Sequence, residues 1–281
     1  METSVIWKGL ALHTWTLDTT PLTDVLRIAS STGWDAIELR RIDFARAAEK
    51  GQSALEVLDL VGKSGLSLAC VGVEMGWMFA KETERKRLLQ AFAESCHWAA
   101  QLGCTTVMSP VDRGCGEPTQ AIASICEVGD IAARHGVRLA LEFSSQAEQI
   151  NTLGRVRDVV TRASHTHCGL LVDSYHLQRS GNDPSVLCQL SPGEIAYVQY
   201  SDVARDGLKP GMITDRLPPG EGTVPFVEFF QRLGEQGYRG YLSYEAPNPS
   251  AWTRNPEEVA REALLATRKL LAVGRSEHAV T

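Results

Sequence analysis

Side chains that carry oxygen stand at the ends of four successive apolar runs, and they are the residues best placed for chemistry. The four are Glu142 in VRLALEF, Asp173 in CGLLVD, Gln199 in IAYVQYSD and Glu245 in GYLSYE. One acid at the end of a buried strand often only reaches water. Four in succession predict a shared centre, and oxygen-rich centres suit a divalent cation.

The expected metal site therefore consists of Glu142, Asp173, Gln199 and Glu245. Three acids and an amide oxygen favour Mn²⁺, Mg²⁺ or Co²⁺, one ion per chain, and the lack of thiolate ligands makes Zn²⁺ less favoured without excluding it. Glu142 and Glu245 are also the candidates for proton exchange with a substrate. Gln199 is the weakest candidate ligand of the four, because a buried glutamine that only makes ordinary hydrogen bonds would look the same in the sequence.

Further candidates for substrate contact come from other run ends and from one long loop. His176 follows Asp173 by three residues, and its alternative role is a backbone hydrogen bond at a helix entry. Arg216 lies in the long segment 202–223, and its alternative is a solvent-exposed position. The first half of the chain adds three polar residues at run ends and two aromatic residues suited to packing on a sugar ring. These five are His13, Glu38, Glu74, Trp15 and Trp77.

A repeated pattern of helix, glycine and strand must position these residues. Five helix-like segments end at a glycine, which suits a left-handed helix C-terminus, and an apolar run follows at once. The expected strands are 5–12, 35–39, 66–73, 104–108, 137–142, 168–173, 195–200 and 240–245. The expected helices are 21–31, 53–63, 82–101, 119–134, 152–163, 184–190, 225–235 and 256–272.

Eight units of buried strand and amphipathic helix predict an α/β fold, a single (β/α)₈ TIM barrel. A doubly wound open sheet is the alternative, but no Gly-x-Gly-x-x-Gly follows the first strand. No linker-like segment divides the chain, so we expect one domain over 1–281 with a flexible tail from about 274 to 281. Barrel active sites lie at the C-terminal ends of the strands, where the four oxygen-bearing residues would converge.

The composition argues against several classes of function. The 281 residues contain 28 Lys and Arg against 34 Asp and Glu, a net charge of −6, and no basic stripe, so we expect no nucleic-acid partner. Seven cysteines without a C-x-x-C pair, an N-terminus unlike a signal peptide and no run of about 18 apolar residues predict a cytoplasmic protein that does not bind membranes. Homo-oligomerisation through the segment 248–254 around Trp252 is left open.

The motifs LALEF, LLVDSYHLQRSG, YVQYSDV with the later RLPPGEG, and GYLSYEAPN resemble the xylose isomerase-like TIM-barrel superfamily. The resemblance covers nearly the whole chain, and the superfamily includes sugar epimerases, inosose dehydratases and isomerases, 3-dehydroshikimate dehydratases and endonuclease IV. It implies that the four strand-end residues hold one divalent metal and that His176 and Arg216 contact the substrate.

Two departures from the family's patterns bear on the reaction. Ketose epimerases typically carry His at the position of Gln199. In this respect the chain is more similar to the dehydratase branch. Dehydratases often place a basic residue soon after the strand-five acid, whereas the segment from Phe143 to Gln146 contains none. Endonuclease IV needs several more metal ligands, mostly histidines, and a DNA-binding surface. The seven histidines, most of them away from the expected strand ends, and the acidic charge argue against it.

The expected activity is a metal-dependent isomerisation or epimerisation of a small ketose, keto-polyol or related keto acid through an enediolate. This small polyhydroxylated substrate would lie between Glu142 and Glu245. The alternative is a dehydratase of the inosose or 3-dehydroshikimate type, which expels a β-hydroxyl group from the same kind of enolate. A third hypothesis is a non-catalytic carbohydrate-binding barrel, which failure to bind any divalent ion would favour.

Overall fold

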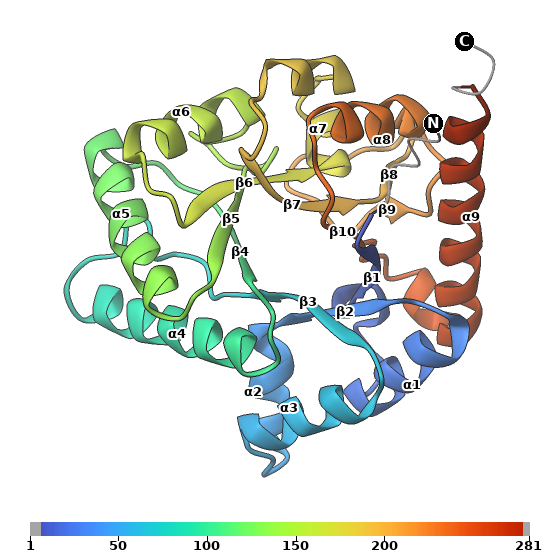
Figure 1. Cartoon of the computed structure of the whole chain (residues 1–281), viewed down its shortest axis with the longest axis horizontal. Helices are drawn as coiled ribbons and strands as arrows, with labels where there is room; N and C mark the ends of the chain where they lie inside the picture. Colours follow the sequence, from blue (N-terminus) through green and yellow to red (C-terminus); the bar gives the residue numbers. More distant parts are fainter. Residues whose placement is uncertain (1–6, 278–281) are drawn as a thin grey trace.

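The computed structural model describes residues 7–277, with side chains to Val273. Eight parallel strands close into a barrel in the order β1-β10-β7-β6-β5-β4-β3-β2, and helices surround it (Figure 1). The (β/α)₈ TIM barrel that the sequence predicts is therefore confirmed. Positions 5 and 6 of the first expected strand and positions 278–281 of the expected tail lie outside the described residues. The barrel strands are β1 (Gly9–His13), β2 (Ala36–Arg40), β3 (Ser67–Gly72), β4 (Thr106–Pro110), β5 (Arg138–Glu142), β6 (Cys168–Asp173), β7 (Ile195–Tyr200) and β10 (Tyr241–Tyr244).

Most helices begin and end close to where the sequence predicts them. The five glycines after helix-like segments all have positive φ angles, between 66° and 94°, so they fill the left-handed positions for which glycine is suited. At the start of the last helix, Asn255 Oδ1 accepts from the Glu257 N–H at 2.9 Å. The long helices are α1 (Leu22–Thr32), α3 (Ala54–Lys63), α4 (Glu82–Gln101), α5 (Pro118–Arg134), α6 (Leu153–Ala163), α8 (Phe226–Glu235) and α9 (Pro256–Glu277).

Two helices were not predicted, α2 (Arg41–Glu49) and α7 (Ser174–Arg179). Each follows its strand directly, because the last strand residue, Arg40 or Asp173, is also the helix N-cap. A helix that begins without a turn lacks the glycine or proline on which the prediction depends. The expected helix at 184–190 is instead the 3₁₀-helix η2 (Pro184–Gln189), and two further 3₁₀-helices are η1 (Thr14–Leu17) and η3 (Ala251–Thr253).

Side chains inside the barrel form a compact lower layer beneath a polar mouth. The inner cluster is dominated by small residues such as Ala11 and Ala140 and is completed by Tyr197 and Tyr241. The larger outer cluster fills the space between strands and helices and contains Leu242. Successive strand residues alternate between these clusters, and the same period of two turns the polar residues near the strand ends toward the barrel axis.

The cysteines agree with their spacing in the sequence. All seven cysteines are free, as their spacing predicts. Burial raises the pKa of Cys104 to about 11, so this thiol is a core residue rather than a nucleophile. No helix within residues 7–277 is long and apolar enough to cross a membrane.

The long segment after β7 is folded around one buried carboxylate. Its two short strands, β8 (Asp202–Val203) and β9 (Arg216–Leu217), form an antiparallel ribbon that was not predicted. Asp202 Oδ1 accepts from the N–H groups of Val203 and Val224, and Oδ2 accepts from those of Gly220 and Gly222. All four distances are 2.8 or 2.9 Å. This carboxylate therefore fixes the path of the segment that carries Arg216.

Replacement of Asp202 by alanine should destabilise the protein, because four backbone N–H groups would lose their acceptor. Buried donors without a partner cost about 1–3 kcal/mol each, so we expect the free energy of unfolding to fall by about 3 kcal/mol or more. Asp202→Asn, which keeps one acceptor oxygen, should lose less. Urea denaturation measures both variants. Asp206→Ala, in the exposed part of the same segment, is the control, and an equally small loss for Asp202→Ala would contradict the proposed anchor.

Candidate metal and substrate site

The four oxygen-bearing residues lie at the C-terminal ends of β5, β6, β7 and β10. These strands are neighbours in the barrel (Figure 1). Glu142 and Asp173 are the last residues of β5 and β6. Gln199 is the penultimate residue of β7, where it is paired in register with Asp173, and Glu245 directly follows β10. All four are buried, and no more than 5% of any of them is exposed. The barrel thus brings the four side chains to one end of its interior.

A single guanidinium links two of the carboxylates. Arg216 places Nη1 2.7 Å from Asp173 Oδ2 and 2.9 Å from Glu245 Oε2. Its Cζ lies 4.3 Å from the centre of the Tyr175 ring, which packs against the guanidinium. Burial lowers the pKa of Arg216, but the neighbouring carboxylates outweigh this effect and raise it above its ordinary value. Among the described residues, Arg216 is the one buried arginine or lysine, and its charge is shared between two acids.

The acids at the mouth hold protons more readily than exposed acids do. Burial, together with the charges of Asp173 and Glu245, raises the pKa of Glu142 well above its ordinary value. Burial raises the pKa of Glu245 to about 7, although the Arg216 guanidinium opposes the shift. A carboxyl group with a pKa near neutrality can both remove and return a proton under ordinary conditions.

Two oxygens of the expected ligand set are buried and have no hydrogen-bond partner among the described residues, Glu142 Oε1 and Gln199 Oε1. Such atoms cost about 1–3 kcal/mol unless something binds them, so they commonly mark a ligand or an ordered water. Glu142, Asp173 and His176 also offer atoms that lie within 4.8 Å of one another. The acids and the amide fit a divalent cation, and Glu142, Asp173, Gln199 and Glu245 are the residues that would hold it.

Hydrogen bonds contact both histidines at the site and fix the tautomer of His13. The Ser145 N–H donates to His176 Nδ1 at 3.2 Å, and the Trp15 N–H donates to His13 Nδ1 at 3.0 Å. Burial lowers the pKa of His176 to about 3 and the pKa of His13 well below its ordinary value, so both rings are neutral. A neutral ring whose Nδ1 accepts carries its proton on Nε2. The proton on His13 Nε2 therefore faces Glu245 Oε1 at 3.3 Å and Glu38 Oε1 at 3.6 Å. For His176, the Ser145 hydroxyl lies 3.0 Å from Nδ1 and can accept its proton, while Nε2 faces Arg216 Nη2, a donor, at 3.4 Å.

Glu38 lies beneath the mouth rather than at the end of its strand, where the sequence placed it. It sits in the middle of β2 and is fully buried. Its Oε2 accepts from the Tyr197 hydroxyl at 3.1 Å, and its Oε1 accepts from Gln199 Nε2 at 2.9 Å. His13 Nε2 lies 3.6 Å from Glu38 Oε1 and 3.3 Å from Glu245 Oε1. Both His13 and Glu38 therefore lie in the polar layer with the expected ligands.

The remaining candidates from the first half of the chain are held by contacts of their own. Trp77 is fully buried in the outer cluster between the barrel and the helices, so it is not the wall of a substrate site. Glu74 lies two residues beyond the end of β3 and pairs with Arg87. Trp15 is half-buried in η1, and its carbonyl accepts from Trp252 Nε1 at 3.3 Å. Trp252 is thus half-buried against its own chain.

Several residues that position the site were not predicted. Ser145 holds His176, Tyr175 packs on Arg216, and Tyr197 binds Glu38. None of them ends an apolar run, and two are aromatic residues of types common in any core. The period of two along β7 could have identified Tyr197, since it places Tyr197 on the same face of the strand as the functional residue two positions later.

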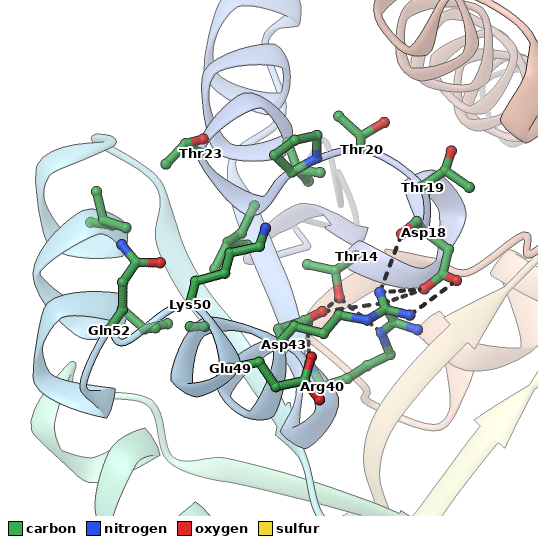
Figure 2. Close-up of a pocket in the computed structure, with 17 residues that line it drawn as sticks. Thr14, Asp18, Thr19, Thr20, Thr23, Arg40, Asp43, Glu49, Lys50 and Gln52 are labelled. Atoms are coloured by element: carbon green, nitrogen blue, oxygen red, sulfur yellow. Dashed lines mark hydrogen bonds and ion pairs between the residues drawn. The ribbon is translucent and has the colours of Figure 1, made fainter.

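A cavity of about 290 Å³ lies beside the mouth, between the start of α1 and helices α2 and α3 (Figure 2). It does not include the four expected ligands. Arg40 crosses its floor and donates to Asp18 at 2.7 Å and to Thr14 at 3.2 Å, while Thr14 donates to Asp43 at 2.5 Å (Figure 2). Because Thr14 directly follows His13, this network of paired charges supports the strand end that presents His13 to the site.

Known proteins resemble this chain in sequence and in fold. The family model described as xylose isomerase-like TIM barrel matches residues 26–270. An inosose isomerase from Halalkalibacterium halodurans is 23% identical over 263 residues, which are 88% of this chain and 90% of that protein. A 3-dehydroshikimate dehydratase from Pseudomonas aeruginosa is 32% identical over 136 residues, 47% of this chain and 21% of that protein. The crystal structure of an IolI protein with a zinc atom has a TM-score of 0.84 at 21% identity, covers 94% of this chain and 98% of that one, and shows the shared fold.

The affinity of the protein for Mn²⁺ or Zn²⁺ should rise between about pH 6 and pH 8, because Glu142 and Glu245 must lose their protons before they can bind a cation. Below the pKa of about 7 of Glu245, each displaced proton should weaken binding by about tenfold per pH unit. Titration calorimetry in two buffers of different ionisation enthalpy measures the affinity and the number of protons released.

Glu148→Gln, which changes an exposed acid on the loop after β5, is the matched control and should leave both quantities unchanged. An affinity that is constant over this pH range would contradict the assignment of the two acids as ligands.

Proposed function

Because the chain belongs to the xylose isomerase-like TIM-barrel family, we propose that it is a divalent-metal-dependent isomerase or epimerase of a small ketose or keto-polyol. The observation that carries the proposal is the pair of buried acids with raised pKa values, Glu142 and Glu245, together with two buried oxygens, Glu142 Oε1 and Gln199 Oε1, that have no hydrogen-bond partner among the described residues. The inosose isomerase among the relatives supports a cyclic keto-polyol as one member of the substrate class.

The acids would carry the proton transfers. A bound divalent ion would supply Lewis-acid stabilisation of the negative charge that develops on the substrate oxygens. Glu245 is held in place on both oxygens, by His13 at Oε1 and Arg216 at Oε2. Glu142 has Oε1 without a protein partner. One acid removes the proton from the carbon beside the carbonyl group, and the other returns a proton to the enediolate.

The histidine and the arginine would orient the substrate. His176 lies between the two other groups: its Nε2 is 3.9 Å from Glu142 Oε1 and 3.4 Å from Arg216 Nη2, which can donate to it. Donors that are fixed before the reaction stabilise developing negative charge on oxygen without reorganisation. His176 and Arg216 therefore suit the carbonyl and hydroxyl oxygens of a ketose.

The charge of the site favours an uncharged substrate. Burial raises the pKa of Glu38 to about 8, so this acid holds its proton near neutrality. The three carboxylates of the expected ligands and one guanidinium then leave a formal charge that one divalent ion would balance. Arg216 is already paired with Asp173 and Glu245, and it is the one buried arginine or lysine among the described residues. A substrate carboxylate or phosphate would have to compete with these acids for the same guanidinium. This consideration favours a ketose or inosose over an anionic keto acid.

A dehydratase is the second candidate, and two observations favour it. Gln199 stands where the ketose epimerases of the resembling family have His, and a segment of 136 residues is 32% identical to a 3-dehydroshikimate dehydratase. The reaction would begin with the same proton removal and would then need an acid beside the leaving hydroxyl group. Glu142, with its raised pKa, would be that acid.

The decisive experiment follows both outcomes in one assay. The protein is loaded with Mn²⁺ and incubated with ketoses, inososes and 3-dehydroshikimate in D₂O. We expect deuterium at the carbon beside the carbonyl group, together with an isomer or epimer of the substrate. A new ultraviolet absorbance from a conjugated enone would favour the dehydratase, and tight metal binding without exchange on any substrate would contradict the isomerase.

Glu245→Gln should keep the fold but lower turnover by about 100-fold or more, because general acid–base groups typically contribute factors of this size. The isomerisation rate at saturating metal and circular dichroism of the variant measure the two effects. Glu148→Gln on the exposed rim loop is the control and should keep the wild-type rate. Turnover like that of the wild type in Glu245→Gln would remove Glu245 from the mechanism.

A further inference from the structure

Glu38 contacts one expected metal ligand, although it is not at a strand end itself. It lies in β2, across the barrel from β7, and none of its surface is exposed. Gln199 Nε2 donates to Glu38 Oε1 at 2.9 Å, and the Tyr197 hydroxyl donates to Oε2 at 3.1 Å. These contacts tie the functional residue of β7 to an acid on the far side of the barrel.

The contact with Glu38 decides which way the Gln199 amide points. Glu38 Oε1 faces the proton on His13 Nε2 at 3.6 Å, independently of Gln199, so this oxygen acts as an acceptor. A reversed amide would place the Gln199 carbonyl against this acceptor and would lose the hydrogen bond. The nitrogen and the oxygen of an amide point in different directions, so the bond at Nε2 turns Oε1 away from Glu38. Gln199 Oε1 is buried and has no partner among the described residues.

We propose that Glu38 is a positioning residue of the metal site, which holds the Gln199 amide so that its oxygen is available as a ligand. The inference rests on the metal dependence in the proposed function and adds a role that is separate from proton transfer. Groups that hydrogen-bond to metal ligands fix their orientation, and their loss typically costs about 10- to 100-fold in metal affinity. An amide needs such a partner more than a carboxylate does, because only one of its two terminal atoms can bind a cation.

Two substitutions at the same position separate orientation from charge. Glu38→Gln keeps an acceptor oxygen for Gln199 and can place its own NH₂ group against the Tyr197 hydroxyl. Glu38→Met has a similar length and removes the acceptor. We expect the dissociation constant for Mn²⁺ to stay within about threefold of wild type in Glu38→Gln and to rise by about 10- to 100-fold in Glu38→Met. Titration calorimetry on the full chain measures it, and Glu38→Ala, which leaves room for water, replaces the Met variant if that variant does not fold.

A double-mutant cycle tests whether the effect passes through Gln199. In the Gln199→Ala background, Glu38→Met should change the metal affinity no further, since there is no amide left to orient. An undiminished effect of Glu38→Met in that background would overturn the proposal, and so would equal losses in Glu38→Gln and Glu38→Met. A wild-type affinity in Glu38→Met would overturn it while leaving the proposed function intact. Failure of the wild-type protein to bind any divalent ion would overturn both.

Discussion

The mouth of the barrel buries three carboxylates, Glu142, Asp173 and Glu245, against one guanidinium, and this imbalance of charge governs the rest of the site. Removing ions from water costs several kcal/mol per ion unless they are paired. Arg216 pairs with two of the acids, and the raised pKa values of Glu142 and Glu245 reduce the remaining charge by keeping protons on them. The same imbalance suits the site to a divalent cation and to acid–base chemistry. If every charge were paired, the site would neither attract a cation nor raise the pKa of an acid.

The position of Arg216 depends on structure far from the strand ends. Its strand, β9, is held in the ribbon by the Asp202 carboxylate, which collects four backbone N–H groups. On the other side, the Tyr175 ring packs on the guanidinium, and the Tyr175 hydroxyl donates to Asp215. The long segment after β7 therefore holds a buried cation in place as well as forming part of the rim. Loss of this support would leave Asp173 and Glu245 without their counter-ion.

The parts of the molecule that sequence could predict are those set by local chemistry. The helix-ending glycines and the apolar runs give the strands and the long helices, because both depend on neighbouring residues alone. The convergence of Glu142 and Glu245 follows once a parallel barrel is assumed. The position of Trp77 in the outer core does not follow, since an aromatic residue after a strand packs equally well on either side of the barrel wall. The bond between Glu38 and Gln199 joins residues 161 positions apart and needs the register of the closed barrel.

The bond between Glu38 and Gln199 also affects how the residue at position 199 can be used to infer the reaction. A glutamine oxygen and a histidine nitrogen are both neutral ligands, so exchanging one for the other leaves the charge of the site unchanged. Either side chain would also have one polar atom free to bind Glu38 beneath it, the amide N–H₂ here at 2.9 Å. Gln199 therefore favours the dehydratase only through its likeness to that branch of the family, and its charge does not choose between isomerisation and dehydration. That choice depends on whether a protonated acid lies beside a hydroxyl group of the bound substrate. Glu142 is the candidate for that acid in this chain, because its pKa is raised and its Oε1 has no hydrogen-bond partner among the described residues.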